Sequence, residues 1–264
     1  MGSQKALFVT GAGSGIGRAV AQYFAGRGWF VGLADVDEAG LAGTAALLPP
    51  GASSIHCLDV RDPAAWEAAL TAFVATAGRL DVLFNNAGVA HGGPLVEHTS
   101  EQVDQMLDVN LRGAIYGAMA AHPHLKATPG SCLLNTCSAA AIYGSPAMAV
   151  YSATKFGIRA LTEALEIEWA ADGIKVRDLM PGFVDTPLLA GPSGRSNVSK
   201  RQRVVDAGLR FTPLQEVAQK AWDAVHRNGT HTLVGGMARQ LSFAARWTPG
   251  KLRRQLLRLA QVIE

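Results

Sequence analysis

Short apolar runs that alternate with longer helix-like stretches constrain the fold of this chain more than any other feature. Seven runs of four to six residues are nearly continuous in hydrophobicity and are candidate strands: 6–10, 29–34, 54–58, 81–85, 131–136, 174–179 and 231–234. Candidate helices lie between them, near 16–27, 37–48, 63–77, 100–122, 149–171 and 213–227. Strands that are apolar on both faces and separated by helices are typical of a parallel sheet covered by helices.

With right-handed crossovers, this pattern predicts an α/β fold: a single doubly wound Rossmann domain with a mainly parallel seven-stranded sheet. No break in composition divides the chain, so we expect one domain over residues 1–264. Ligands of such a sheet bind at the carboxyl ends of the strands. The longest irregular stretch, 185–212, follows the sixth candidate strand, and we expect it to be a substrate loop or lid.

The first candidate strand leads into a glycine-rich turn, "TGAGSGIG" at 10–17. Glycines let a backbone approach a pyrophosphate, and the helix that follows offers unpaired N–H groups and the positive end of its dipole. We therefore expect a nucleotide on this turn, in contact with Gly11, Ser14, Gly15, Ile16 and Gly17. The alternative is a turn of the same shape that binds no ligand.

Asp35 ends the second candidate strand, 18 residues after Gly17. A carboxylate at this position can accept hydrogen bonds from an adenosine ribose and would repel a 2′-phosphate. No arginine follows directly, because the next residues are Val36 and Asp37. This favours NAD over NADP. Asp35 could instead be a helix N-cap, a role that Asp37 can fill equally well.

The stretch "YSATK" places Tyr151 and Lys155 one turn apart on one face of a predicted helix. Together with the glycine turn and Asp35, it makes residues 5–236 similar to the short-chain dehydrogenase/reductase family. Further motifs occur in the family's order: "LDV" at 58–60, "NNAG" at 85–88, "DVNLRG" at 108–113, Ser138, and "PGFVDT" at 181–186.

This resemblance implies a set of site residues. The tetrad that it identifies as catalytic is Asn110, Ser138, Tyr151 and Lys155. The additional cofactor contacts that it implies, together with Tyr151 and Lys155, are Asp59, Val60, Asn86, Ala87, Gly88, Pro181, Gly182, Val184 and Thr186. Each motif alone has a structural explanation, such as a turn or a strand end, and their joint order carries the assignment.

The expected reaction needs a group that removes or returns the hydroxyl proton while the cofactor handles the hydride. Tyr151 is the candidate, but a free tyrosine has a pKa of about 10. An ammonium group one turn away, on Lys155, is expected to lower the pKa of the phenol, as is the positive ring of an oxidised nicotinamide. Ser138 is expected to hydrogen-bond the substrate oxygen. By resemblance, Asn110 holds a water that connects Lys155 to solvent.

We therefore expect an NAD-dependent oxidoreductase that interconverts a secondary alcohol and a ketone. The apolar residues Phe183, Leu188, Leu189, Leu209 and Phe211 near the substrate loop suggest a lipophilic substrate such as a hydroxysteroid. Two alternatives stay open. One is an NADPH-dependent reductase of the 3-oxoacyl type, and the other is a non-catalytic NAD-binding sensor or scaffold.

Charge and cysteine content narrow the partners and the location. A net charge of +3 is too small to indicate nucleic-acid binding. Cys57, Cys132 and Cys137 have neither disulfide-framework nor zinc spacing, and the two histidines in "AHPHLK" at 121–126 have no nearby cysteine, so we expect no metal. With no signal peptide before the first apolar run, we expect a cytoplasmic protein. The family resemblance implies a homo-oligomer, either a dimer or a tetramer.

Three features fall outside the family pattern. The tail 237–264 is an added helical extension in which Leu252, Leu256, Leu259 and Ile263 recur at helical spacing, and its arginines could touch an anionic membrane. Packing of that apolar stripe on the protein itself is the more common outcome. Asp178 lies in a strand that should be buried, where pairing with Arg177 or another cation is expected. His91 lies in a turn that leads toward the substrate side.

Overall fold

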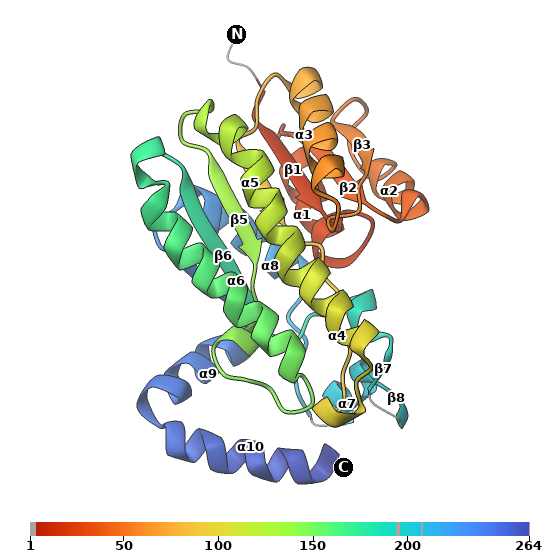
Figure 1. Ribbon diagram of the computed structural model, residues 1–264, viewed down its shortest axis with the longest axis vertical. Coiled ribbons are helices and arrows are strands. Elements are labelled where there is room, and N and C mark those ends of the chain that lie inside the picture. The colour runs from red at the N-terminus through yellow and green to blue at the C-terminus, as the bar shows by residue number, and fades with distance from the viewer. Residues whose placement is uncertain (1–3, 194–195, 207, 264) are drawn as a thin grey trace.

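The computed structural model describes residues 4–193, 196–206 and 208–263. Its centre is a seven-stranded sheet with the order β3-β2-β1-β4-β5-β6-β9, and all neighbouring pairs are parallel (Figure 1). The strands are β1 (Ala6–Thr10), β2 (Phe30–Asp35), β3 (Ser53–Cys57), β4 (Val82–Asn85), β5 (Cys132–Thr136), β6 (Lys175–Pro181) and β9 (His231–Val234). The predicted α/β class and parallel sheet are confirmed.

Helices cover both faces of the sheet. The α-helices are α1 (Gly15–Ala25), α2 (Glu38–Ala45), α3 (Pro63–Ala77), α4 (Ser100–Leu107), α5 (Gly113–Lys126), α6 (Ala149–Glu168), α7 (Lys200–Asp206), α8 (Leu214–His226), α9 (Gly236–Trp247) and α10 (Pro249–Ile263). Helices α3, α5 and α6 lie in front of the sheet in Figure 1, and α1 and α8 lie behind it. The two layers bury separate aromatic clusters, one around Trp66 and Phe73 and the other around Phe24 and Trp29.

The order of the strands reverses between β1 and β4. After β1 the chain moves outward through β2 and β3, and it then returns to pair β4 with the opposite side of β1. The carboxyl ends of β1 and β4 therefore border a crevice, which is where doubly wound sheets bind nucleotides. The glycine turn follows β1, and "NNAG" straddles the end of β4.

The prediction of one uninterrupted helix over 100–122 is wrong. The chain forms α4, then a π turn over Asp108–Arg112, and then α5, which continues to Lys126. The reason is the wider turn, in which hydrogen bonds run from i to i+5 and accommodate one extra residue. Such turns occur frequently at functional sites, and Asn110 lies in the middle of this one.

The stretch 185–212 is more ordered than predicted. It contains a short 3-10 helix at Pro187–Leu189, the antiparallel pair β7 (Pro192–Ser193) and β8 (Ser196–Ser199), and α7. After β9 the chain forms α9 and α10, which lie at the end of the molecule toward which the strands point (Figure 1). Within the described residues, no helix has both the length and the apolar character needed to cross a bilayer.

Candidate active site

The turn after β1 is shaped by glycine. Gly11 and Gly15 have positive φ values of 68° and 51°, which glycine adopts without a steric penalty. Ser14 precedes α1, but its side chain makes no capping hydrogen bond. Over the residues that the structure describes, no side chain caps the first backbone N–H groups of α1, so an anion can bind them.

Gly17 lies where α1 passes closest to β1. A Cβ atom at Gly17 would come within 2.7 Å of the carbonyl carbon of Gly11 and 2.8 Å of Asn86 Nδ2. Only glycine fits this approach. The half-buried Ile16 next to it packs against the core beneath the turn. The turn, its free N–H groups and this close approach fit a pyrophosphate.

Asp35 closes over the glycine turn. Its Oδ2 accepts a hydrogen bond from the backbone N–H of Gly13 at 2.9 Å, and its Oδ1 accepts one from Asp37 at 3.1 Å. Asp37 is the N-cap of α2, since its carboxylate accepts from the N–H of Gly40. Asp35 is therefore not needed as the cap, and its carboxylate stands beside the turn where an adenosine ribose would lie.

Arg18 is a residue near this site that the sequence analysis missed. Its guanidinium donates to Thr44 Oγ1 at 2.9 Å and to the carbonyl oxygens of Gly13 and Gly40. Gly13 is also the residue that Asp35 binds, so a cation and a carboxylate flank the same turn. Arg18 directly follows the glycine motif, and only the folded turn brings it close to the end of β2.

The segment after β3 lies next to Asp35, since the backbone N–H of Leu58 donates to the Asp35 carbonyl at 2.9 Å. Asp59 is held by Arg61, with 2.9 Å between Oδ1 and Nε, and this hydrogen bond lowers the pKa of Asp59. Val60 is buried, and its carbonyl accepts a hydrogen bond from the Trp66 indole at 3.0 Å. Hydrogen bonds therefore hold both of these expected cofactor contacts next to the end of β2.

"NNAG" ties three strand ends together. The backbone N–H groups of Asn86 and Ala87 both donate to Thr10 Oγ1, at 3.0 and 3.1 Å. The Asn86 amide donates to the Thr10 carbonyl at 2.9 Å and accepts from Thr136 Oγ1 at 3.0 Å. The Asn86 side chain is thus occupied in linking β1, β4 and β5. Gly88 is exposed, so a ligand at this edge can reach its backbone.

Asn110 is almost fully buried, at 2% exposure. Its side-chain amide forms two hydrogen bonds with the backbone of Val89, accepting from the N–H and donating to the C=O, each at 2.8 Å. A third, longer contact of 3.4 Å reaches Thr154 on α6. The amide therefore fixes the segment after β4, so a water that links Lys155 to solvent would have to bind to other atoms of the π turn.

Ser138, Tyr151 and Lys155 come together at the carboxyl end of β5. Ser138 caps the short 3-10 helix Ala139–Ala141, and its hydroxyl lies beside the Tyr151 phenol, where burial raises the pKa of Tyr151 and the hydrogen bond to Ser138 offsets part of that rise. Lys155 lies one turn further along α6, and its Nζ donates to the Thr136 carbonyl at 2.8 Å. The helix spacing thus places the phenol and the amine along one side of the site.

The electrostatics of the pair differ from the expectation. Burial raises the pKa of Tyr151 to about 12 and lowers the pKa of Lys155 to about 8. The amine lies 5.6 Å from the centroid of the phenol ring, and desolvation is the largest cause of the shift in both pKa values. In the protein alone, the lysine does not bring the phenol toward neutral pH.

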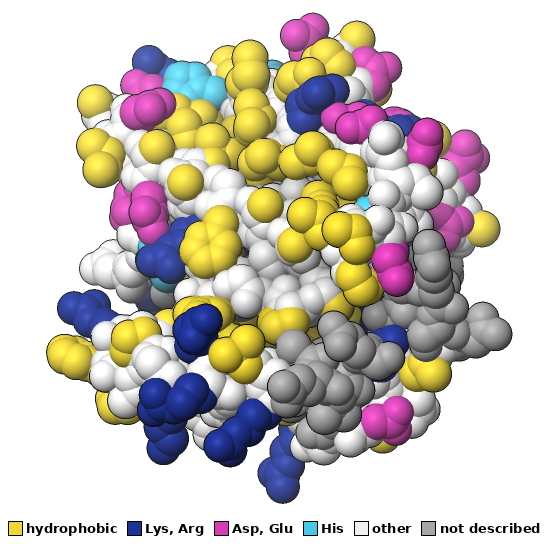
Figure 2. Space-filling view, turned by 60° about the horizontal axis from the view of Figure 1, so that its bottom comes forward, with side chains coloured by type: hydrophobic (Ala, Val, Ile, Leu, Met, Phe, Trp, Pro, Cys, Tyr) yellow, Lys and Arg dark blue, Asp and Glu magenta, His cyan; other side chains and the backbone are white. Residues whose placement is uncertain are grey.

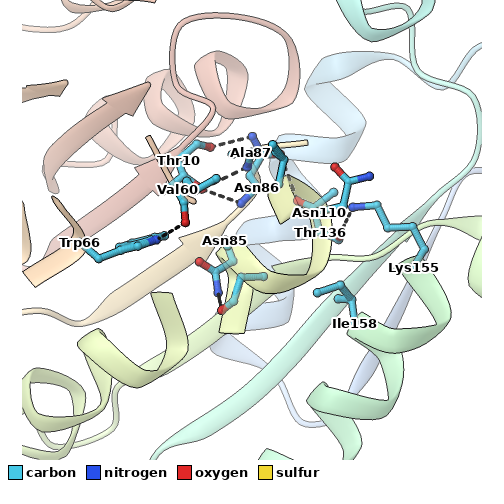
Figure 3. Close-up of a pocket in the computed structure, with 13 residues that line it drawn as sticks. Thr10, Val60, Trp66, Asn85, Asn86, Ala87, Asn110, Thr136, Lys155 and Ile158 are labelled. Atoms are coloured by element: carbon cyan, nitrogen blue, oxygen red, sulfur yellow. Dashed lines mark hydrogen bonds between the residues drawn. The ribbon is translucent and has the colours of Figure 1, made fainter. Parts of the chain in front are cut away.

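A small cavity of about 10 Å³ opens between β4, β5 and the π turn (Figure 3). Its polar wall includes Asn85, Asn110, Thr136 and Lys155. Within the described part of the chain, the buried Oδ1 of Asn85 has no hydrogen-bond partner. A polar cavity of this size holds about one water molecule, so a solvent molecule next to Lys155 is consistent with these walls.

The loop after β6 reaches over the glycine turn. Pro181 and Val184 are buried, and a Cβ at Gly15 would lie 3.1 Å from Thr186 Cγ2. Gly182 packs against α9, with its Cβ position 2.9 Å from Met237 Cε. This loop therefore adjoins both the expected phosphate turn and the C-terminal helices.

Lys200 is a second residue that sequence reasoning missed. It begins α7, is buried, and donates from Nζ to the Ala90 carbonyl at 2.5 Å. Burial lowers its pKa. The bond ties the substrate loop to the segment after β4, where His91 is hydrogen-bonded to Gln105 at 2.7 Å. No sequence signal distinguishes Lys200 from the basic residues that follow it.

The other polar residues that the sequence singled out, Asp178 and one histidine of "AHPHLK", take part in structural hydrogen bonds. Asp178 is fully buried and accepts from His231 Nδ1 at 2.8 Å, whereas Arg177 pairs with Glu166. The partner of Asp178 is thus His231 of β9 and not Arg177. His122 of "AHPHLK" is hydrogen-bonded to Asp172 at 2.8 Å. Over the described ranges, no three His, Cys, Asp or Glu side chains form a metal-ligand cluster.

The sequence profile of the short chain dehydrogenase family matches residues 5–194. The chain belongs to this family. It is 34% identical over 238 residues to meso-2,3-butanediol dehydrogenase of Serratia marcescens, covering 89% of this chain and 94% of that one. It is 35% identical over 185 residues to 3-alpha-(or 20-beta)-hydroxysteroid dehydrogenase of Mycobacterium tuberculosis, covering 70% of each.

Among solved structures, 3-ketoacyl-(acyl-carrier-protein) reductase from Brucella melitensis, complexed with NADH, superposes with a TM-score of 0.79. The two chains are 30% identical, and the match covers 89% of this chain and 98% of that one. The family assignment made from the motifs is therefore confirmed, and this protein is a short-chain oxidoreductase.

Proposed function

We propose that this short-chain oxidoreductase interconverts a secondary alcohol and a ketone with NAD(H). The observation that carries the proposal is the meeting of Ser138, Tyr151 and Lys155 at the carboxyl end of β5, next to the glycine turn. The butanediol and hydroxysteroid dehydrogenases that this chain resembles act, by their names, on alcohols, which supports the reaction class.

In this proposal the phenol of Tyr151 exchanges the proton with the substrate oxygen. With its pKa raised to about 12, the phenol is protonated at neutral pH, the form that donates to a ketone. Ser138 hydrogen-bonds the same oxygen and stabilises charge that develops on it. A bound nicotinamide would accept or supply the hydride, and in its oxidised form its positive charge would stabilise the phenolate. Lys155 positions the ribose and adds a second positive charge.

Asp35 supports NAD as the cofactor. Its carboxylate is fixed beside the glycine turn, where it can accept hydrogen bonds from ribose hydroxyls and repel a 2′-phosphate. The NADH complex of the structural relative agrees with this choice. Two observations favour the alternative, an NADPH-dependent reductase of the 3-oxoacyl type. Arg18 offers a cation on the other flank of the turn, and the same structural relative is by name a 3-ketoacyl reductase.

For the substrate we propose an apolar secondary alcohol or its ketone. Leu189 is buried, and Leu188 and Phe211 are half-buried in the segment that follows β6. Lys200 holds this segment against the segment that follows β4. The expected homo-oligomer and cytoplasmic location stay predictions from the sequence.

The test is to follow nicotinamide absorbance with NAD and NADP against a panel of short aliphatic alcohols and hydroxysteroids. We expect turnover with NAD and little with NADP. Asp35→Ala should narrow that difference by removing the repulsion of the 2′-phosphate. A clear preference of the unaltered enzyme for NADP would refute the role of Asp35.

The proton-transfer role has its own test. Tyr151→Phe should lower kcat by about a thousandfold or more, within the range for a lost general acid or base, while NAD binding persists. Tyr23→Phe makes the same chemical change on α1, where the ring packs against Arg27 instead, and should keep full activity. Normal turnover by Tyr151→Phe would overturn the mechanism. Flat traces from the unaltered protein with the whole panel would favour a non-catalytic NAD-binding role.

A further inference from the structure

Positive charge is concentrated in the last two helices. From residue 236 onward the chain carries six cations and one acid, a net charge of +5, so the other 235 residues carry −2 of the total of +3. The six cations are Arg239, Arg246, Lys251, Arg253, Arg254 and Arg258. This segment differs in charge from the domain to which it is attached.

Among the described residues, these six cations have no acidic partner. In the described ranges every ion pair lies elsewhere, and none of the six approaches a carboxylate within 4 Å. By contrast, Arg177, Arg159 and Arg201 each bind a carboxylate at 2.8 Å. The part of the protein that the structure describes thus does not neutralise the charge of the tail, which is available to a partner.

Apolar side chains are exposed on the same face as the cations. Phe243 and Trp247 on α9 are 64% and 65% exposed, and Leu257 on α10 is 50% exposed. On α9, Arg239, Phe243 and Arg246 follow each other at spacings of four and three, which places them on one side of the helix. Lys251, Arg254 and Leu257 repeat that arrangement on α10 with two spacings of three.

The opposite faces of the two helices are turned toward the protein. Ala238 and Leu252 are buried, and α9 lies against the short 3-10 helix that follows Ser138. Two residues of the apolar stripe are described, the buried Leu252 and the half-buried Leu256. They pack inward, which agrees with the expectation that the stripe packs on the protein itself. The exposed cationic and apolar face described above is a separate surface (Figure 2).

We propose that this face of α9 and α10 docks on an anionic phospholipid bilayer. Side chains of Lys and Arg interleaved with Trp, Phe and Leu match a membrane interface, where phosphates lie above acyl chains. A second copy of this chain would bring two faces of like charge together, which opposes self-association. Because no described helix can span a bilayer, the contact is peripheral, with both helices lying in the plane of the surface.

Docking would orient the enzyme. Met237 of α9 contacts Gly182 in the loop after β6, and the helix pair lies at the end of the molecule to which the carboxyl ends of the strands point. The bilayer would therefore lie on the same side as the candidate active site.

The experiment is co-sedimentation of the full-length protein with vesicles of phosphatidylcholine alone or with about 30% phosphatidylglycerol, at low and high salt. We expect pelleting only with the anionic vesicles, and release at high salt. Arg254→Glu with Arg258→Glu should weaken partitioning by about tenfold or more, because each basic residue near an anionic surface contributes severalfold. Trp247→Ser should weaken binding without changing the charge.

The matched control is Arg27→Glu with Arg227→Glu. Both arginines are exposed, the change in net charge is the same, and both lie just before the amino ends of strands, Arg27 before β2 and Arg227 before β9, whereas α9 and α10 lie at the carboxyl ends. This pair should leave vesicle binding unchanged, and a thermal melt verifies that each variant is folded. Absence of pelleting by the unaltered protein, or equal loss in both pairs, would overturn the proposal. Binding of an RNA oligonucleotide with no binding to vesicles would assign the face to nucleic acid instead.

Discussion

Replacing Gly17 by alanine tests the close approach of α1 to the glycine turn. The added Cβ would lie 2.7 Å from the carbonyl carbon of Gly11, whereas carbon atoms in contact are about 3.5–4.0 Å apart. The overlap of about 1 Å involves backbone on both sides, so no side chain can rotate to relieve it. The N-terminus of α1 must move away from β1.

The magnitude follows from two opposing contributions. Overpacking of this kind costs about 1–3 kcal/mol, and here the upper end applies because the collision is with backbone. Alanine in place of glycine within a helix returns about 1 kcal/mol. The expected net loss is about 2 kcal/mol, or roughly 4–8 °C in melting temperature for a chain of this size. Displacement of the free N–H groups should also weaken NAD binding.

Gly43→Ala is the matched control. Gly43 is an exposed glycine within α2, and the nearest atom to its Cβ position is Arg18 Nη2 at 3.8 Å. It gains the helix contribution without the collision, so it should be stabilised by about 1 kcal/mol. Both variants are compared by thermal unfolding followed by circular dichroism and by calorimetric titration with NAD. If Gly17→Ala has the same melting temperature as Gly43→Ala and binds NAD normally, the reasoning from the close contact is refuted.

Three further substitutions probe buried charge and backbone strain. Burial lowers the pKa of Lys155 to about 8, so the folded protein binds fewer protons than the unfolded chain between about pH 8 and 10.5. Lys155→Met should therefore raise the free energy of unfolding at pH 7 by up to about 3 kcal/mol. In urea unfolding this gain should be lost as the pH rises toward 10.5. The hydrogen bond to Asp178 raises the pKa of His231, so the stabilisation by this bond is present below about pH 6.5 and is lost as the pH rises through the higher pKa of the folded state. His231→Gln should lower the free energy of unfolding by about 1 kcal/mol at pH 6. An equal loss at pH 9 would contradict this. Ala147 has a φ of 58°, so Ala147→Gly should be neutral or stabilising by up to about 1 kcal/mol in the same unfolding assay, and clear destabilisation would show that the strain is absent.

The parts of the fold that were predictable are those with a local cause. Each run such as "ALFVT" is apolar on both faces, so its burial in a parallel sheet follows from composition alone. The end of α3 also follows from local signals, since Pro63 starts the helix and Gly78 ends it with a positive φ. The boundaries 63–77 were accordingly predicted without error.

The parts that were missed depend on contacts distant in sequence. Asp178 finds its partner 53 residues away, and Lys200 binds a carbonyl 110 residues away, so no spacing rule could pair them. The pKa of Tyr151 was predicted in the wrong direction for the protein alone. The spacing to Lys155 was correct, but the burial that controls both groups comes from the packing of α6.

The π turn between α4 and α5 has a consequence for changes in chain length. A π turn contains one residue more than the α-helical turn that it replaces, so the residues after Arg112 are rotated by about 100° relative to a regular helix. Deletion of a single residue within Asp108–Arg112 would let α4 and α5 merge into one regular helix with its outer faces preserved. The same deletion would withdraw Asn110 from Val89. One codon lost at this point would therefore leave a folded protein whose strand ends are no longer held in place for chemistry.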